Sequence, residues 1–161
     1  MNEEQCRQIQ ELYLEMQPKL LSYARVRLNS MDQAEEAIQE TFRIACGKPE
    51  QLLESGNPPG WLMNTLKYVI LDTMRQQESG RQLLSKYLLA MSTAITFTED
   101  KISLDVLYEN IADREEFTLI KEMAVDGRSH QEMAAARGIS VDACKKRVQR
   151  AKETLKSKLK L

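Results

Sequence analysis

Positively charged side chains gather in the last 25 residues of the chain. Residues 137–161, RGISVDACKKRVQRAKETLKSKLKL, contain nine Lys or Arg residues and two acidic ones, although the formal net charge of all 161 residues is only −1. Lys and Arg side chains bind phosphate oxygens, and Lys, Arg and Gln also hydrogen-bond base edges in the DNA major groove. The chemistry that this segment predicts is therefore the binding of nucleic acid.

The spacing of apolar residues in this segment decides which polar side chains point outward. Apolar residues recur every three or four positions, as on one stripe of an amphipathic helix: Cys144, Val148, Ala151, Leu155 and Leu159. With this stripe inward, the outward face holds Gln149, which suits adenine, and Lys146, which suits guanine. The predicted DNA-binding residues of this helix are Ser140, Asp142, Lys145, Lys146, Gln149, Arg150, Lys152 and Lys156. The alternative interpretation is a solvated surface on a helical hairpin.

Two capping patterns place this helix second in a helix-turn-helix. Ser129 and Glu132 have the S-x-x-E spacing of a capping box, which opens the short helix HQEMAAAR. Gly138 ends that helix, and Ser140 caps the next one. A capped short helix, a glycine-containing turn and a longer basic helix form the helix-turn-helix pattern, whose second helix enters the major groove. The helix before them, capped by Asp113 and Glu116 and ending near Gly127, carries Phe117, Ile120 and Met123.

Glycine and proline mark where the earlier helices begin and end, and the chain lacks the sustained alternation that is typical of strands. Pro18 predicts a break or restart in the first helix, because proline cannot donate a backbone hydrogen bond. Asp32, with Glu35 three residues later, predicts the capped start of a helix that ends at residues 47–49. The prolines at 58–59 suit the first turn of another helix.

The expected fold is all-α, with two small helical domains joined by a linker. Residues 1–79 are expected to form a four-helix bundle, and residues 111–161 the helix-turn-helix domain. Residues 80–110 become rich in Ser, Thr and β-branched side chains, which predicts a linker with room for a short helix near residues 83–89. Residues 1–80 carry a net charge of −4 and residues 111–161 one of +4, so a polyanion is attracted to the C-terminal third.

Residue types that carry enzyme chemistry are scarce. The three Cys residues form no C-x-x-C pair, and the single His130 cannot complete a zinc cluster. The chain has neither a glycine-rich phosphate loop nor a Ser–His–Asp set, so no enzyme activity, cofactor or metal site is predicted. The acidic N-terminus lacks a signal-peptide pattern, and no apolar run reaches about 18 residues, which argues against membrane insertion. Scattered thiols fit a reducing cytoplasm.

Three segments taken together resemble a known protein family. AEEAIQETFRIA at residues 34–45 and PPGWLMNTLKYVILDTMRQQ at residues 58–77 look like region 2 of bacterial RNA polymerase sigma factors. NIADREEFTLIKEMAVDGRSHQEMAAARGISVDACKKRVQRAKETL at residues 110–155 looks like region 4. Both regions in this order, joined by a short linker, resemble the extracytoplasmic-function (ECF) class of the sigma-70 family.

The resemblance implies a cytoplasmic transcription initiation factor whose two halves divide the work. Region 2 would bind the β′ clamp of core RNA polymerase through Ala34, Glu35, Gln39, Glu40 and Phe42. It would also open and recognise the −10 promoter element, through the loop at 47–60 and the helix from Trp61 to Arg75. The DNA-binding residues implied there are Trp61, Asn64, Lys67, Tyr68 and Arg75. Region 4 would read the −35 element and touch the β flap, and an anti-sigma protein is a further expected partner.

Other roles stay open from the residues alone. A stand-alone helix-turn-helix regulator would act as a dimer on palindromic DNA without polymerase, with residues 1–90 as a dimerisation or ligand domain. A structural helical adaptor would need no DNA at all. In the first half, Phe42 is expected to be partly core, and Trp61 is alternatively a packing anchor rather than a platform for a base. The acidic first half, with its ETF and WL motifs in family order, favours the sigma factor.

Overall fold

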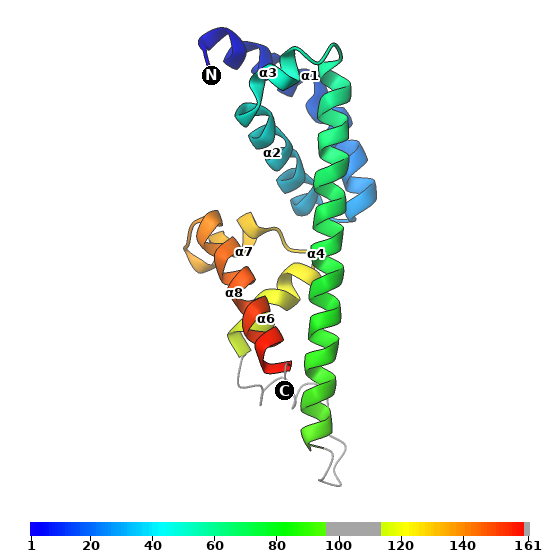
Figure 1. Ribbon diagram of the computed structural model, residues 1–161, viewed down its shortest axis with the longest axis vertical. Helices are drawn as coiled ribbons and strands as arrows, with labels where there is room; N and C mark the ends of the chain where they lie inside the picture. Colours follow the sequence, from blue (N-terminus) through cyan, green and yellow to red (C-terminus); the bar gives the residue numbers. More distant parts are fainter. Residues whose placement is uncertain (96–113, 160–161) are drawn as a thin grey trace. The chain divides into compact units, whose positions relative to one another are not determined.

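The computed structural model describes residues 1–95 and 114–159, and the regular structure in these two ranges is entirely helical (Figure 1). The all-α prediction is therefore confirmed. Contacts divide the chain into two compact units, Met1–Arg75 and Gln76–Leu161, which are called here the first and the second unit. The helices are α1 (Glu3–Leu28), α2 (Met31–Gly47), α3 (Pro49–Leu53), α4 (Pro58–Ile95), α6 (Arg114–Ala124), α7 (His130–Arg137) and α8 (Val141–Leu159).

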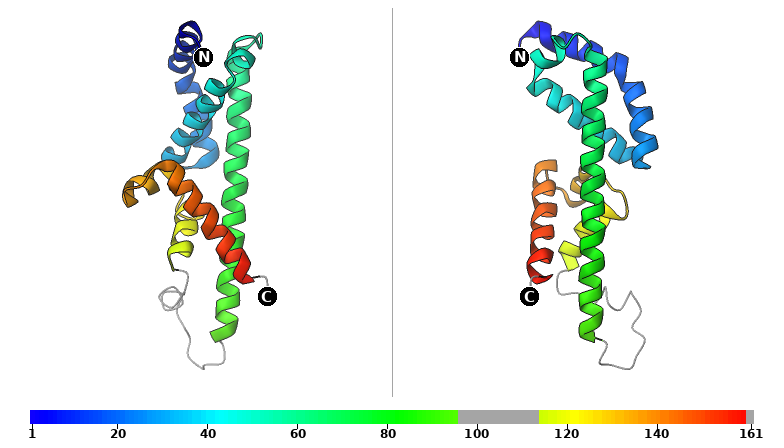
Figure 2. Two further views of the ribbon diagram at one scale, coloured as in Figure 1. Left: turned by 60° about the vertical axis from the view of Figure 1, so that its left-hand side comes forward. Right: turned by 45° about the vertical axis from the view of Figure 1, so that its right-hand side comes forward.

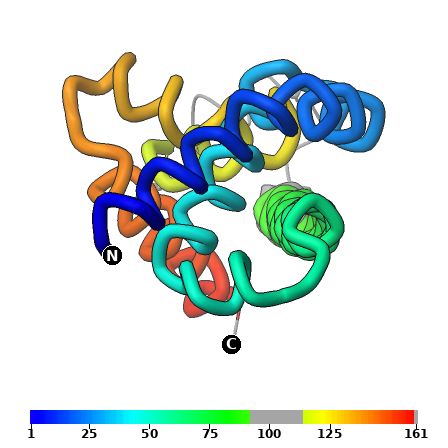
Figure 3. The backbone as a smooth tube through the Cα atoms, turned by 90° about the horizontal axis from the view of Figure 1, so that it is seen from above, coloured from blue at the N-terminus to red at the C-terminus, as the bar shows by residue number. Residues whose placement is uncertain are grey.

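The first unit is built from α1, α2, α3 and the beginning of α4, which enclose one apolar core. Figure 3 looks along α4 and shows the coils of α1, α2 and α3 beside it. Leucines fill the centre of this core, and alanines let α1 and α2 approach closely. Its fully buried members include Leu20, Ala24, Ala34, Ala45, Leu52, Leu62 and Leu66.

The backbone of α1 passes through Pro18 without interruption, so the predicted break at this proline is wrong. Pro18 leaves the carbonyl of Leu14 without its usual helical donor. Both residues are exposed, and water can satisfy that carbonyl on the outer face of the helix. The helix ends at Asn29, whose φ of 54° is left-handed and whose N–H donates to the carbonyl of Arg25.

The start of α2 lies at Ser30, so the prediction of Asp32 as its cap is wrong. Ser30 has an extended backbone, and its hydroxyl accepts a hydrogen bond from the N–H of Gln33. Asp32 lies one residue inside α2, where its carboxylate is favourable near the positive end of the helix dipole. An extended backbone is what distinguishes a cap from a first-turn acid, and composition does not reveal it.

The linker predicted at residues 80–110 differs from the structure over its first half. Residues 80–95 are helical and belong to α4, while the remainder of that range lies outside the described residues. Leu83, Leu84 and Tyr87 are buried in the core of the second unit. Gly80 allows this contact, since a Cβ there would lie 2.8 Å from the Cβ of Ala124. This part of α4 is a packing helix of the second unit.

The second unit packs α6, α7 and α8 with the latter part of α4 around a second core. Figure 2 shows α6 and α8, which pack against each other in this unit, from two directions. The rings of Tyr87 and Phe117 lie 6.4 Å apart and are tilted by 44°. The fully buried side chains of this core include Ile120, Met133, Cys144 and Leu155.

Candidate nucleic-acid interface

The turn between α7 and α8 is set by two serine caps and one glycine. The hydroxyl of Ser129 accepts from the N–H of Glu132 at 3.1 Å, and the hydroxyl of Ser140 accepts from the N–H of Ala143 at 3.1 Å. Gly138 has a φ of 65° and donates its N–H toward the last turn of α7. The predicted caps and the predicted helix stop are confirmed, and three residues, 138–140, separate the two helices.

Helix α8 presents the faces that its apolar spacing predicts. Its inward stripe is buried at Cys144, Val148, Ala151 and Leu155, and Leu159 packs against the same core. The outward residues Asp142, Lys145, Lys146, Gln149, Arg150 and Lys156 are exposed, as is the Ser140 cap. Lys152 is different, because it is only 7% exposed, so its predicted place beside the outward face is wrong. Lys152 directly follows Ala151 at the edge of the buried stripe, and its side chain is buried with that stripe.

The exposed face of α8 is basic and polar. In the described part of the chain, Lys145, Lys146 and Arg150 form no ion pair, so their charges are available to an anion. Gln149 donates from Nε2 to Glu153 Oε1 at 3.3 Å, an exposed contact that a base edge can replace. Amides and cations in this arrangement suit base edges and phosphates of a duplex.

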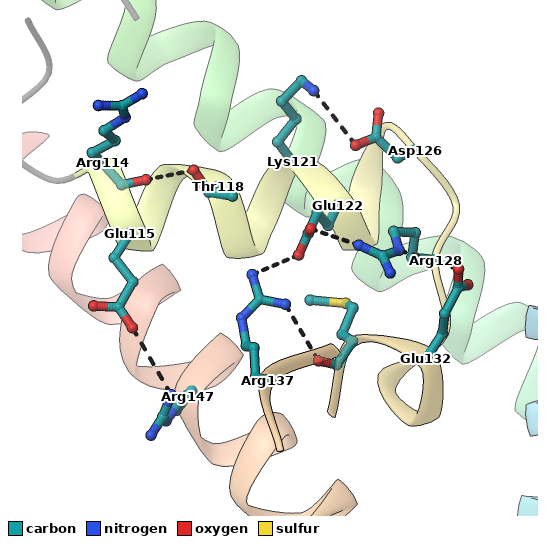
Figure 4. A network of polar contacts seen from close by, with 11 residues as sticks. Arg114, Glu115, Thr118, Lys121, Glu122, Asp126, Arg128, Glu132, Arg137 and Arg147 are labelled. Carbon is teal, nitrogen blue, oxygen red and sulfur yellow. Dashed lines mark hydrogen bonds and ion pairs between the residues drawn. The ribbon is translucent and has the colours of Figure 1, made fainter. Parts of the chain in front are cut away.

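A carboxylate on α6 links the residue before the cap of α7 to the last residue of α7 (Figure 4). Glu122 accepts from Arg128 Nη1 and from Arg137 Nη2, each at 2.7 Å. Arg128 also lies 3.3 Å from Glu132. Burial by itself lowers the pKa of Arg128, but the carboxylates of Glu122 and Glu132 raise it above its ordinary value. Sequence reasoning missed this network, because Glu122 and Arg137 are 15 residues apart and on different helices.

On the first unit, three of the five residues predicted to bind polymerase reach the surface. Glu35 and Gln39 are exposed, and Glu40 is partly exposed and paired with Arg43 at 2.6 Å. Ala34 is 0% exposed and Phe42 is 8% exposed, so both lie in the core, as was expected in part for Phe42. The Phe42 ring meets Tyr13 edge-on, with 4.9 Å between ring centroids. Ala34 and Phe42 therefore pack α2 against the first core, and this packing leaves the acidic side of α2 exposed.

On α4, three of the predicted −10 residues share one exposed face. Asn64, Tyr68 and Arg75 are exposed and recur at helical spacing, with Leu71 between the last two. Tyr68 is 67% exposed and Leu71 51%, so an aromatic and an aliphatic side chain lie side by side on the open face of this helix. Trp61 is partly buried against the first core, as the packing interpretation expected.

Lys67 is also exposed, and its side chain is held by a residue of α1. Its Nζ lies 5.7 Å from the centre of the Tyr23 ring, and the Arg27 guanidinium lies 5.1 Å from the same ring. Cations near an aromatic face are attracted by the ring quadrupole, whose face has a negative electrostatic potential. Sequence reasoning missed Tyr23 and Arg27. The spacing of four residues between Tyr23 and Arg27 puts both side chains on one face of α1, and this spacing could have predicted their contact.

Comparison with known proteins bears on the first unit. Residues 12–80 match the family model of sigma-70 region 2. The match supports the relationship to the RNA polymerase sigma-70 family that the motifs indicated. It also supports a role in transcription initiation. The region 2 match contains the exposed residues of α2 and the exposed face of α4, and it ends before α6, α7 and α8.

No curated protein and no solved structure matched the chain. Among residues 1–95 and 114–159, no helix is long and apolar enough to cross a bilayer. The same residues hold no group of three or more His, Cys, Asp or Glu side chains placed to bind a metal ion.

Proposed function

We propose that this chain is an initiation factor of the ECF class, which binds bacterial core RNA polymerase in the cytoplasm and directs it to promoters by reading −10 and −35 elements. The observation that carries the proposal is the combination of a sigma-70 region 2 match with a capped helix-turn-helix in one chain. The chain supplies binding surfaces, and the polymerase supplies the chemistry.

The polymerase contact is assigned to the exposed side of α2. Glu35, Gln39 and Glu40 form an acidic and polar surface there, which complements a basic helical partner such as the β′ clamp. Electrostatic complementarity of this kind raises the association rate and selects the partner. Ala34 and Phe42 contribute indirectly, because they set the position of α2 on the core.

Contact with the opened −10 strand is assigned to the exposed face of α4. An unstacked base needs an aromatic or apolar surface, and Tyr68 with Leu71 offers one. Lys67 and Arg75 lie on the exposed side of the same helix and suit the phosphates of that strand. Asn64 adds an amide that hydrogen-bonds base edges.

Reading of the −35 duplex is assigned to α8. Lys146 and Gln149 are placed for base edges, and Lys145, Arg150 and Lys156 for phosphates. The overall charge of the chain is −1, so its attraction to DNA by charge alone is weak. Stable promoter binding therefore depends on the polymerase that carries the chain.

The test is binding to core polymerase followed by transcription from the DNA upstream of the chain's own coding region. Purified chain should bind core polymerase, and the complex should start transcripts at a defined site. Glu35→Lys reverses an exposed charge on α2 and should weaken polymerase binding. Glu15→Lys makes the same change on the exposed surface of α1 and serves as the control. Failure of the unmodified chain to bind core polymerase would refute the proposal.

The same experiment separates the proposal from a stand-alone regulator. A regulator of that type shifts its DNA in a gel without polymerase, as a dimer on two half-sites about 34–36 Å apart. The proposed initiation factor should shift promoter DNA only when core polymerase is present. Since an anti-sigma protein is a further expected partner, the chain is best purified from a host that lacks its neighbouring genes.

A further inference from the structure

Helix α7 has little of its own to hold it in place. It is eight residues long, and only Met133 and Ala134 are buried. Helices shorter than about 12–15 residues are marginal in isolation. The caps at Ser129 and Gly138 fix where α7 begins and ends, and α7 packs more closely against α8 than against α6.

The carboxylate of Glu122 supplies a link at both ends of α7. Its Oε1 accepts from Arg128, the residue directly before the Ser129 cap, and its Oε2 accepts from Arg137, the last residue of α7. The side chains of all three residues are partly buried, so solvent screens the contacts less than it screens surface pairs. One side chain of α6 thus holds the start and the end of the same short helix.

We propose that Glu122 is a positioning residue for promoter reading, which holds α7 and the turn after it so that α8 meets the duplex in the correct orientation. In a helix-turn-helix, the first helix crosses the DNA backbone while the second reads the bases. Glu122 itself touches no DNA in this scheme. The inference rests on the proposed function, since it assumes that α8 reads the −35 duplex.

Loss of the Glu122 charge should act most strongly at the end of α7. Arg128 keeps a second carboxylate in Glu132 at 3.3 Å. Arg137 keeps only a longer contact, from Nη1 to the carbonyl of Met133 at 3.4 Å, within its own helix. The end of α7 that leads into the turn therefore loses its tie to α6.

The first measurement follows amide hydrogen exchange in the full-length chain. The N–H of Ile139 bonds to the carbonyl of Ala134 at 3.0 Å and reports on the end of α7. Glu122→Gln should speed its exchange about tenfold, the factor expected for loss of a charge-assisted hydrogen bond. Glu122→Asp keeps the charge and should restore part of the protection. Glu115→Gln removes an equal charge from an exposed position on α6 and is the control.

The second measurement follows binding of the core polymerase complex to promoter DNA. Glu122→Gln should weaken binding to the −35 duplex by about tenfold, while polymerase binding and the salt dependence of DNA binding stay unchanged. Lys156→Ala, which removes an exposed cation of α8, should lower the salt slope instead. Arg137→Met should resemble Glu122→Gln, and Arg137→Lys should be milder because it keeps the charge.

The outcomes separate this inference from the function on which it rests. Faster exchange at the end of α7 together with weaker duplex binding supports it. Unchanged exchange, or unchanged binding by Glu122→Gln when the unmodified chain binds well, overturns the role of Glu122 alone. A reduced salt slope for Glu122→Gln would also overturn it, since that indicates a lost phosphate contact. If the unmodified chain forms no promoter complex, the proposed function fails and the inference with it.

Discussion

The polar contacts inside the first unit differ from those inside the second unit. In the first unit, α1 and α2 have 26 and 17 residues, and the Arg7–Glu4 and Arg43–Glu40 ion pairs each join residues of one helix. The hydrogen bond from Gln5 to Glu50, which joins α1 to α3, is exposed, and so is Lys67, which contacts the Tyr23 ring. In the second unit, α6 and α7 have 11 and 8 residues, and polar contacts join separate elements. Arg137 reaches Glu122, and Arg81 donates from Nε to the carbonyl of Ala124 at 2.9 Å.

The difference follows from helix length. A long amphipathic helix buries enough apolar surface to fix its own orientation, whereas two turns bury little. Helix α7, with only two buried residues, therefore relies on directional contacts, which define orientation more sharply than apolar packing. A unit that must read base edges needs that precision, because base readout depends on hydrogen-bond geometry.

The largest effect expected from this comparison is a core truncation in the first unit. Leu66 is fully buried, and Leu66→Ala should lower the stability of that unit by about 2–5 kcal/mol. Unfolding is followed by fluorescence of the single tryptophan, Trp61, which lies in the first unit. Leu14→Ala, at an exposed position of α1, should change little. If Leu155→Ala in the second unit shifts the Trp61 transition equally, the units do not unfold separately and the comparison fails.

A close contact in the second unit gives the next effect. Gly80→Ala places a Cβ 2.8 Å from the Cβ of Ala124, and overpacking of this kind costs about 1–3 kcal/mol, partly offset by the better helix propensity of alanine. Amide exchange in α6 should quicken while the Trp61 transition stays in place. Gly47→Ala, where a Cβ meets nothing within 4 Å, is the control. Equal stability of both variants would show that α4 does not press on α6.

Substitutions on α8 test whether the directional unit reads bases. Lys146→Ala and Gln149→Ala should each cost about 1–3 kcal/mol at particular base pairs of the −35 element, and little elsewhere. Competition between promoter duplexes, each changed at one base pair and assayed with the polymerase complex, measures this. Equal losses on every sequence would show that these side chains contact the backbone instead.

The smallest effect is expected from an ion pair within one helix of the first unit. Arg43→Ala removes the Arg43–Glu40 ion pair, and exposed pairs three residues apart contribute about 0.2–0.5 kcal/mol. Thermal unfolding of Arg43→Ala and Arg137→Ala, each followed in its own unit, compares a helix-local pair with a pair that joins elements. A larger loss of stability for Arg43→Ala than for Arg137→Ala would show that pairs joining separate elements are not the stronger ones.

Much of the second unit could be predicted because its pattern is local. The caps at Ser129 and Ser140 and the stop at Gly138 depend on residues within one turn, and the structure places them as expected. The stripe from Cys144 to Leu155 follows from helical spacing alone. Lys152 shows the limit of that method, because helical spacing gives an angle but not the width of the buried face.

In the first unit, the sequence predicted the motifs correctly, but it did not predict which motif residues are exposed. The sigma-70 region 2 motifs were recognised, and the family match covers residues 12–80. The motif places Ala34 and Phe42 among the polymerase-binding positions, and the structure shows that both side chains are buried. A motif records which positions matter together and does not separate those that touch a partner from those that hold the helix.

The sequence by itself determined the helical class, the turn before α8, the outward face of that helix and the region 2 motifs, because each depends on neighbouring residues or on recurring spacing. Only the tertiary structure decided that α4 continues to Ile95 and packs in the second core through Leu83, Leu84 and Tyr87. It also decided that Glu122 receives Arg128, which precedes the cap of α7, and Arg137, the last residue of α7. Such contacts join residues far apart in the chain, and their partners are chosen by the packing of whole helices.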